Sequence, residues 1–204
     1  MQRFISLGWN TVPLRGELKR REDGSKTEPR FEKGWKAKYT EETNAVCSKL
    51  GGVMTGKVSD IIAIDCDNDV TYELFRALNP DYQFIFKSKG KLDADGNEKN
   101  CATIIYKYEE GLIDTFSINN GVIALDVYSD GGFVYLPTAA NETKEAWTGK
   151  TPQLTEMPLA VKVLLKQLCQ EPVTTQPSTV TSNNIITANC LAPLVKEFTE
   201  TRKF

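Results

Sequence analysis

The stretch Ile61-Ile62-Ala63-Ile64-Asp65-Cys66-Asp67 joins four apolar residues to two carboxylates that bracket one cysteine. Its apolar run predicts a buried strand over residues 61–66. Because side chains alternate along a strand, Asp65 and Asp67 point to the same face. Two oxygen donors on one face suit Mg²⁺ or Mn²⁺, although the same pair before Asn68-Asp69 also suits a turn and a helix N-cap. The rest of the chain must decide between these readings.

Around this strand the sequence predicts a mixture of helices and strands. Helices are predicted at residues 4–5, 40–50, 70–78 and 159–169. Further strands are predicted at residues 12–14, 82–86, 102–108, 122–127 and 133–136. Turn residues predict a charged loop or hairpin at 15–30, a tight turn at Asp95-Gly96 and a hairpin turn at 129–132. This order predicts an α+β fold with a mostly antiparallel sheet.

The chain length predicts one main domain followed by a tail. The 204 residues suit one larger domain or two small lobes. We expect this domain over residues 1–170, a Thr/Ser/Pro-rich linker over 171–184 and a helical segment over 185–204. That last segment is expected to begin a further module, with a native tail as the alternative.

Composition excludes several kinds of chemistry. The chain has no histidine, which removes Ser-His-Asp and Cys-His catalysis and histidine zinc sites. Its five cysteines form no Cys-x-x-Cys pair, so neither a disulfide framework nor a zinc site is predicted. No apolar stretch is long enough to span a bilayer, and we expect a cytoplasmic protein without membrane contact.

Charge is unevenly distributed along the chain. Residues 1–40 carry ten Lys or Arg against five acids, whereas residues 41–204 carry 15 against 22. A basic N-terminal segment can contact phosphate, but it also suits a solvated loop.

A third carboxylate, Asp126, follows the apolar run of residues 122–125 in another predicted strand. Three acids at strand ends suit two-metal phosphoryl transfer, in which the acids hold cations that activate an attacking oxygen. Asp130 is the rival third acid, although its place before Gly131-Gly132 is more typical of a turn. The acids alone do not distinguish a polymerase from a nuclease.

The order of motifs resembles the primase-polymerase branch of the archaeo-eukaryotic primase superfamily between about Leu7 and Leu168. The matching motifs are Gly8-Trp9, Val12-Pro13-Leu14, Lys33-Gly34-Trp35, Thr55-Gly56-Lys57 before the Asp-x-Asp strand, Leu125-Asp126-Val127, Asp130-Gly131-Gly132, Trp147 and Met157-Pro158. The resemblance implies an N-terminal α/β lobe packed on an RRM-like lobe, with the active site in the cleft between them. Asp65, Asp67 and Asp126 would hold two Mg²⁺ or Mn²⁺ ions there, and no zinc is expected.

One motif of this family has a different sequence in this chain. The family usually carries Ser-x-His or Gly-x-His on the strand after the first acids, and the histidine contacts the nucleotide phosphates. Thr103 stands at that position, and its hydroxyl can donate a hydrogen bond but carries no charge. Lysines at positions 87, 89, 91 and 99 on the preceding connection, and Lys57 after Thr55-Gly56, are candidates to hold a triphosphate instead. A solvated hairpin is the alternative for the lysines at 87–91.

Nucleic-acid contacts are predicted in the basic N-terminal segment. Trp35 lies beside Lys33, Lys36 and Lys38, and an aromatic ring among lysines suits stacking on a base of a single strand. Core packing is expected for Trp9, and Trp147 is expected to shield the sheet.

The sequence thus predicts a DNA primase-polymerase that condenses nucleoside triphosphates on a single-stranded DNA template. A fused or associated replicative helicase is the expected partner, in a viral, phage or plasmid replication system. The alternatives are a primase-like domain that binds single-stranded DNA and recruits a helicase with weak or no catalysis, and a metal-dependent nuclease.

Overall fold

The computed structural model describes residues 2–22, 24–41, 46, 48–79, 85–93, 95–145 and 154–170. The chain divides into two units, Met1–Pro172 and Val173–Phe204, and all described residues belong to the first. The helices are α1 (Gln2–Ile5), α2 (Trp35–Glu41), α3 (Asp69–Leu78) and α4 (Leu159–Gln170). The strands are β1 (Thr11–Leu14), β2 (Leu50–Met54), β3 (Ile61–Cys66), β4 (Ile85–Ser88), β5 (Ala102–Lys107), β6 (Phe116–Asn119), β7 (Ala124–Tyr128), β8 (Phe133–Tyr135) and β9 (Lys144–Glu145).

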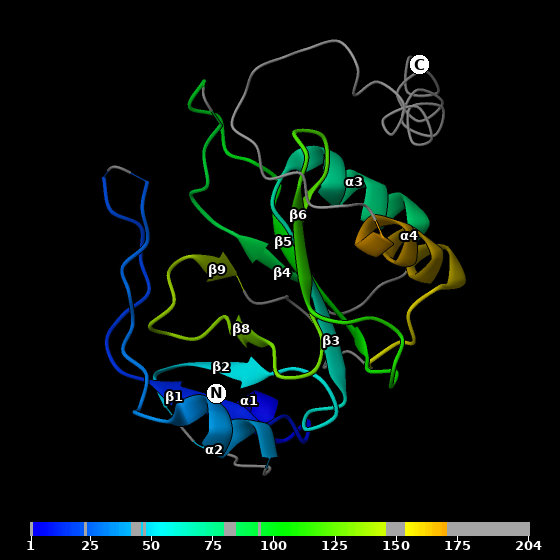
Figure 1. The fold of residues 1–204 in the computed structure, drawn as a ribbon. Coiled ribbons are helices and arrows are strands. Elements are labelled where there is room, and N and C mark those ends of the chain that lie inside the picture. Colours follow the sequence, from blue (N-terminus) through cyan, green and yellow to red (C-terminus); the bar gives the residue numbers. More distant parts are fainter. Residues whose placement is uncertain are drawn as a thin grey trace. The chain divides into compact units, whose positions relative to one another are not determined.

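The strands form two sheets, as Figure 1 shows. The larger sheet has the order β6-β7-β3-β5-β4-β9, and the smaller has the order β1-β2-β8. All pairings between these strands are antiparallel. The α+β class and the antiparallel sheet predicted from the sequence are therefore confirmed. β3 lies inside the larger sheet between β5 and β7, and its residues 61–64 are buried on both faces, which explains why its apolar run is continuous.

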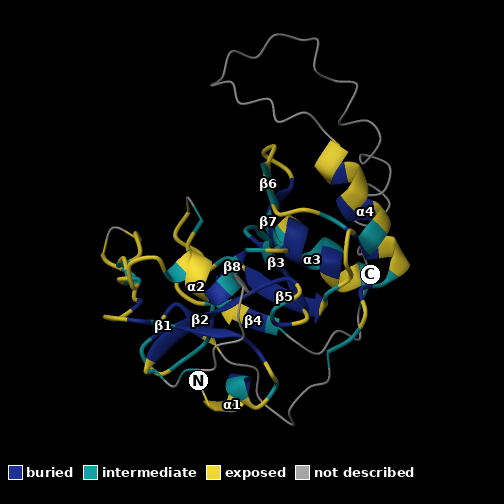
Figure 2. Ribbon diagram, turned by 60° about the horizontal axis from the view of Figure 1, so that its bottom comes forward, coloured by how far each residue is buried: buried dark blue, intermediate teal, exposed yellow. Residues whose placement is uncertain are grey.

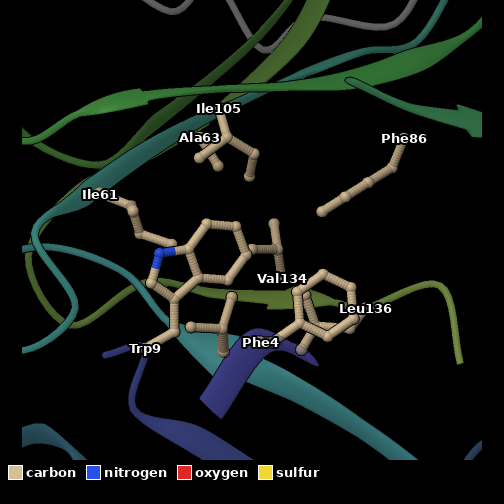
Figure 3. Packing of buried hydrophobic residues seen from close by; sticks show 9 residues of the cluster. Phe4, Trp9, Ile61, Ala63, Phe86, Ile105, Val134 and Leu136 are labelled. Atoms are coloured by element: carbon tan, nitrogen blue, oxygen red, sulfur yellow. The ribbon is translucent and has the colours of Figure 1, made fainter. Parts of the chain in front are cut away.

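A hydrophobic core joins one face of the larger sheet to the smaller sheet (Figure 3). Ile61 and Ala63 of β3 contribute from the larger sheet, and Val53 and Val134 from the smaller one. Trp9 is fully buried in this core, with its ring stacked on Phe4 at a centroid distance of 5.5 Å. The expected packing role of Trp9 is therefore confirmed.

The opposite face of the larger sheet is covered by α3. Ile62 and Ile64 point to this face, and Tyr106 of β5, opposite Ile62, shares it. The side-chain amide of Asn79, just after α3, donates a hydrogen bond to the Tyr106 hydroxyl over 3.3 Å. Figure 2 shows α3 and α4 side by side, each with buried and exposed stretches. The face toward which Asp65 points is therefore the one that packs on the smaller sheet, opposite α3.

The helix predicted at residues 40–50 is wrong. Thr40 and Glu41 end α2, and Leu50 already begins β2, whereas residues 42–45 and 47 lie outside the described part. Gly51 and Gly52, which follow the predicted helix, are residues of β2. A Cβ at Gly52 would lie 2.1 Å from a Phe133 ring carbon, so glycine is required there by the close approach of β8.

The hairpin predicted across residues 129–132 is also wrong. β7 and β8 flank this turn, yet they belong to different sheets and do not pair. Thr55 accounts for the crossing, because its hydroxyl donates to the Ser129 carbonyl over 2.6 Å and its backbone N–H donates to the Gly132 carbonyl. The turn thus carries the chain from one sheet to the other.

Most other predicted elements are confirmed within a few residues. These are the elements at 4–5, 12–14, 61–66, 70–78, 102–108, 122–127, 133–136 and 159–169, the hairpin at 15–30 and the turn at Asp95-Gly96. β2, β6 and β9 were not predicted. Trp147, residues 80–84 and the segments predicted at 171–184 and 185–204 lie outside the described residues.

Candidate active site

Asp65 lies in a row of polar residues that crosses three strands. In the register of the larger sheet, Asp65 of β3 is opposite Asp126 of β7 on one side and Thr103 of β5 on the other. Residues directly opposite in antiparallel strands share a face, with Cβ atoms about 5 Å apart. We call Asp126, Asp65 and Thr103 the acid row.

The acid row begins where the hydrophobic core ends. Ile61, Ala63 and Asp65 point to the same face of β3, and the first two are fully buried under the smaller sheet. The Asp65 side chain retains 21% of its exposure. The carboxylate is therefore partly open to solvent.

Asp65 is held by a threonine and a buried lysine. The Thr103 hydroxyl donates a hydrogen bond of 2.7 Å to Asp65 Oδ1. Lys144 of β9 donates to the Thr103 hydroxyl, and its Nζ lies 3.8 Å from Asp65 Oδ1. Lys144 reaches the row because it pairs with Ser88 of β4, on the same face as Phe86 beside Thr103.

The surrounding charges keep Asp65 ionised. Burial acts to raise the pKa of this carboxyl, but the Lys144 charge, the Thr103 hydrogen bond and the charges of Lys26 and Lys91 together lower the pKa below its usual range. Asp65 is therefore an anion at neutral pH.

Asp67 follows the end of β3 and is turned toward a lysine. Its backbone N–H donates to the Ala124 carbonyl over 2.8 Å, which continues the pairing with β7. Lys91 Nζ lies 2.5 Å from Asp67 Oδ1 and 3.1 Å from its carbonyl oxygen. The Asp67 side chain is 42% exposed, so this ion pair is open to solvent.

Asp126 is approached by a tyrosine from its own strand. The Tyr128 hydroxyl donates to Asp126 Oδ2 over 3.2 Å. Burial, followed by the negative charges of Asp126 and Asp65, raises the pKa of Tyr128. The tyrosine therefore stays a neutral hydrogen-bond donor at physiological pH.

The three predicted ligands are not gathered around one point. Within the described residues, no three Asp, Glu, Cys or His side chains lie together in a way that could hold a metal ion. Asp65 and Asp126 are direct neighbours in the sheet, whereas the Asp67 carboxylate is bonded to Lys91. Carboxylate oxygens are a donor set that fits Mg²⁺ or Mn²⁺, and Asp65 and Asp126 are directly opposite one another in the sheet.

Two lysines that were not predicted from the sequence lie near Asp65. Lys144 lies in a two-residue strand with no recognisable pattern, and Lys26 comes from the hairpin at residues 15–30. Burial first, and then the positive charges of Lys144, Arg20 and Lys91, lower the pKa of Lys26, while Asp65 acts in the opposite direction. Much of the Lys26 residue is exposed to solvent, whereas its ammonium is partly buried and lies within reach of these charges.

Three of the predicted phosphate lysines lie together elsewhere on the same sheet edge. Lys87, Lys89 and Lys99 line a hollow of about 320 Å³, which Glu98, Glu145 and Tyr72 also line. Lys89 lies 3.8 Å from Glu145, and both side chains are at least half exposed.

Lys57 lies at the other end of β3. Its neighbour Gly56 pairs with Ile61, the first residue of the strand, so Lys57 is separated from Asp65 by the strand length. Asp130 lies near it, because its Oδ1 accepts the Lys57 backbone N–H over 2.9 Å. The Tyr108 hydroxyl donates to the other oxygen, so Asp130 is engaged as a turn residue away from the acid row.

Trp35 lies on the outer face of the smaller sheet. It stacks on Phe31 at 4.3 Å and meets the edge of Phe133 at 5.3 Å, in a cluster with Met54. Met54 alternates with Val53, whose side chain points to the larger sheet. The predicted nucleic-acid residues Lys33, Lys36 and Lys38 accompany Trp35 there, and Lys38 pairs with Glu32 at 3.1 Å. The smaller sheet therefore separates them from the acid row.

No helix in the described part of the chain has the length and apolar character needed to cross a membrane. Comparison with models of known protein families gave no match, and a search of curated proteins found no similar sequence.

Proposed function

We propose that this chain is a metal-dependent nucleotidyltransferase that acts as a primase-polymerase on single-stranded DNA. The observation that carries the proposal is the register of Asp65 with Asp126 and Thr103 across three neighbouring strands. Acids separated by 60 residues in the sequence thus become neighbours at the edge of a buried core. The order of motifs that resembles primase-polymerases is the second support.

The residues of the row have separate roles in this proposal. Asp65 and Asp126 would hold a divalent cation, with Asp67 joining them when Lys91 releases it. A cation bound there would neutralise phosphate charge and activate the attacking 3′-oxygen. Lys144 and Thr103 keep Asp65 ionised and oriented, and Lys144 brings a positive charge close to where the motif histidine stands in the family.

The substrates in this proposal are nucleoside triphosphates and a single-stranded DNA template. The smaller sheet with its helices would be the N-terminal lobe, the larger sheet the RRM-like lobe, and the template would lie in a cleft at the acid row. A replicative helicase, fused or associated, would supply the unwound template.

A second candidate function is a primase-like domain that binds single-stranded DNA and recruits a helicase but polymerises poorly. The ion pair of Asp67 with Lys91 favours it, because a carboxylate held by lysine is not available to a cation. The absence of histidine from the chain favours it as well.

Incorporation of labelled nucleotides on single-stranded DNA tests the proposal. Reactions with Mg²⁺ and with Mn²⁺, with and without a primer, are compared between the wild type and an Asp65→Ala, Asp67→Ala double variant. We expect template-dependent incorporation by the wild type and none by the variant. No incorporation by the wild type under either metal, or equal incorporation by the variant, would refute the enzyme. Degradation of the labelled strand without added triphosphates would identify a nuclease instead.

A further inference from the structure

The hairpin at residues 15–30 is fastened to the edge of the larger sheet. Leu18 exchanges backbone hydrogen bonds with the segment before β9, accepting from Glu142 and donating to Ala140 over 2.8 and 2.9 Å. Farther along the hairpin, Arg20 is paired with Lys26 in an antiparallel bridge. These contacts bring Arg20 and Lys26 of the hairpin close to β9, the strand that carries Lys144.

Arg20 is fixed against the connection between β4 and β5. Its Nε donates to the Lys89 carbonyl over 2.9 Å, and its Cδ lies 3.3 Å from the position that a Cβ on Gly90 would take. Lys91, two residues after Lys89, binds Asp67. Arg20 thus stands next to the segment that reaches the acids.

One donor of the Arg20 guanidinium has no acceptor among the described residues. Its Nη1 donates to the Gly24 carbonyl over 3.1 Å, whereas Nη2 is buried and, within the described residues, has no hydrogen-bond partner. Leaving a buried charged donor unpaired is costly, and a bound anion is one arrangement that satisfies such a group in native proteins. Because Nη2 belongs to a positively charged guanidinium, the partner that suits it best is an anionic hydrogen-bond acceptor.

The cations outnumber the acids at this place. Lys26 feels the charges of Lys144, Arg20 and Lys91, and Asp65 feels those of Lys144, Lys26 and Lys91, so four cations lie about the three carboxylates of Asp65, Asp67 and Asp126. Like charges held close together repel one another, and an anion bound among them offsets this repulsion. A guanidinium and several ammonium groups match a polyphosphate, whose oxygens accept a bidentate Arg and several point charges at once.

We infer that Arg20, Lys26, Lys91 and Lys144 form a binding site for a polyphosphate group, the triphosphate of a nucleotide, beside the acid row. This inference deepens the proposed function and rests on it for the identity of the ligand. Of the lysines predicted to hold a triphosphate, Lys91 belongs to this site, whereas Lys87, Lys89 and Lys99 line the separate hollow. Lys91 and Lys144 would exchange their carboxylate partners for phosphate oxygens, which frees Asp67 and Asp65 for a cation.

Inorganic tripolyphosphate is the probe, because it carries the charge of the ligand without base, sugar or template. Its binding is measured by isothermal titration calorimetry in metal-free buffer for the wild type, Arg20→Gln, Lys26→Gln and Lys166→Gln. Lys166 is an exposed lysine of α4, so its variant controls for the change in net charge. Circular dichroism confirms that each variant is folded.

We expect Arg20→Gln and Lys26→Gln each to weaken binding about tenfold, the size of a lost charge-assisted hydrogen bond or close charge pair, and Lys166→Gln to leave it unchanged. No binding by the wild type, or equal affinities in all four proteins, would overturn the site. The result is independent of catalysis. Tripolyphosphate binding without nucleotide incorporation would refute the proposed function alone, whereas incorporation with unchanged KM for nucleotide in Arg20→Gln and Lys26→Gln would refute this inference alone.

Discussion

Replacing Lys144 by methionine tests how the acid row is held together. The change removes the donor to Thr103 and the charge 3.8 Å from Asp65 Oδ1, while methionine fills most of the space of the lysine stem. Hydrogen bonds to charged groups contribute about 1.5–3 kcal/mol, and removing one partner of a fully buried ion pair costs about 3–5 kcal/mol. Asp65 retains 21% of its side-chain exposure and keeps the Thr103 hydrogen bond, so the expected loss lies within the lower of these ranges. We expect the free energy of unfolding at pH 7 to fall by about 2 kcal/mol.

The pH dependence of this loss separates the ion pair from simple packing. Because Lys144 lowers the folded pKa of Asp65, the pair stabilises the fold fully above the unfolded pKa of about 3.9 and loses its effect as pH falls through the folded pKa. Lys144→Met should therefore cost less at pH 3 than at pH 7.

Urea denaturation of a double-mutant cycle gives the measurement. The wild type, Lys144→Met, Asp65→Asn and the double variant are unfolded at both pH values, and the coupling energy is calculated. We expect a coupling of about 1 kcal/mol or more at pH 7 and a smaller one at pH 3. An equal cost of Lys144→Met at the two pH values, together with a coupling near zero, would refute the described role of Lys144.

Three further substitutions test the fold that positions the row. Gly52→Ala should destabilise the protein by about 1–3 kcal/mol in urea unfolding, because the added Cβ would lie 2.4 Å from the Val134 carbonyl oxygen and would clash with the Phe133 ring. A neutral effect would contradict the packing of β2 on β8. Asn68→Ala should lose about 1 kcal/mol, since the Asn68 side chain caps α3 by accepting the Thr71 N–H over 2.8 Å, and unchanged thermal unfolding would contradict this cap. Phe75→Ala should cost about 3–5 kcal/mol, because Phe75 is the fully buried anchor of α3, and a loss below about 1 kcal/mol would show that α3 does not pack there.

The fold was predictable where local pattern and tertiary environment agree. The run at residues 61–64 is apolar on both faces because the smaller sheet covers one face of β3 and α3 covers the other. Its pattern therefore predicted a buried strand. The helix predicted at residues 40–50 is wrong. Two consecutive glycines such as Gly51 and Gly52 are typical of the end of a helix, but in the structure the glycine at position 52 is required by the close approach of the Phe133 ring. That requirement comes from a residue 81 positions away and leaves no local signal.

Part of the candidate site was predictable for the same reason. Asp65, Asp67 and Asp126 follow apolar strands, which is a local signal, and their order within a set of motifs supplied the context. Lys144 and Lys26 carry no such signal, because one belongs to a two-residue strand and the other to a charged hairpin. Their place beside Asp65 depends on how β9 and the hairpin pack on the sheet edge, which no local pattern shows.

Primer extension with two matched acid variants tests the central proposal most directly. Asp126→Asn removes a carboxylate beside Asp65, whereas Asp130→Asn makes the same change in the turn four residues later, where the carboxylate is engaged by Lys57 and Tyr108. On a primed single-stranded DNA template with Mn²⁺, we expect Asp126→Asn to lower the rate of nucleotide incorporation by about a hundredfold or more and Asp130→Asn to retain most of it. Wild-type rates in Asp126→Asn, or loss of incorporation in Asp130→Asn alone, would contradict the assignment of the acid row as the catalytic centre.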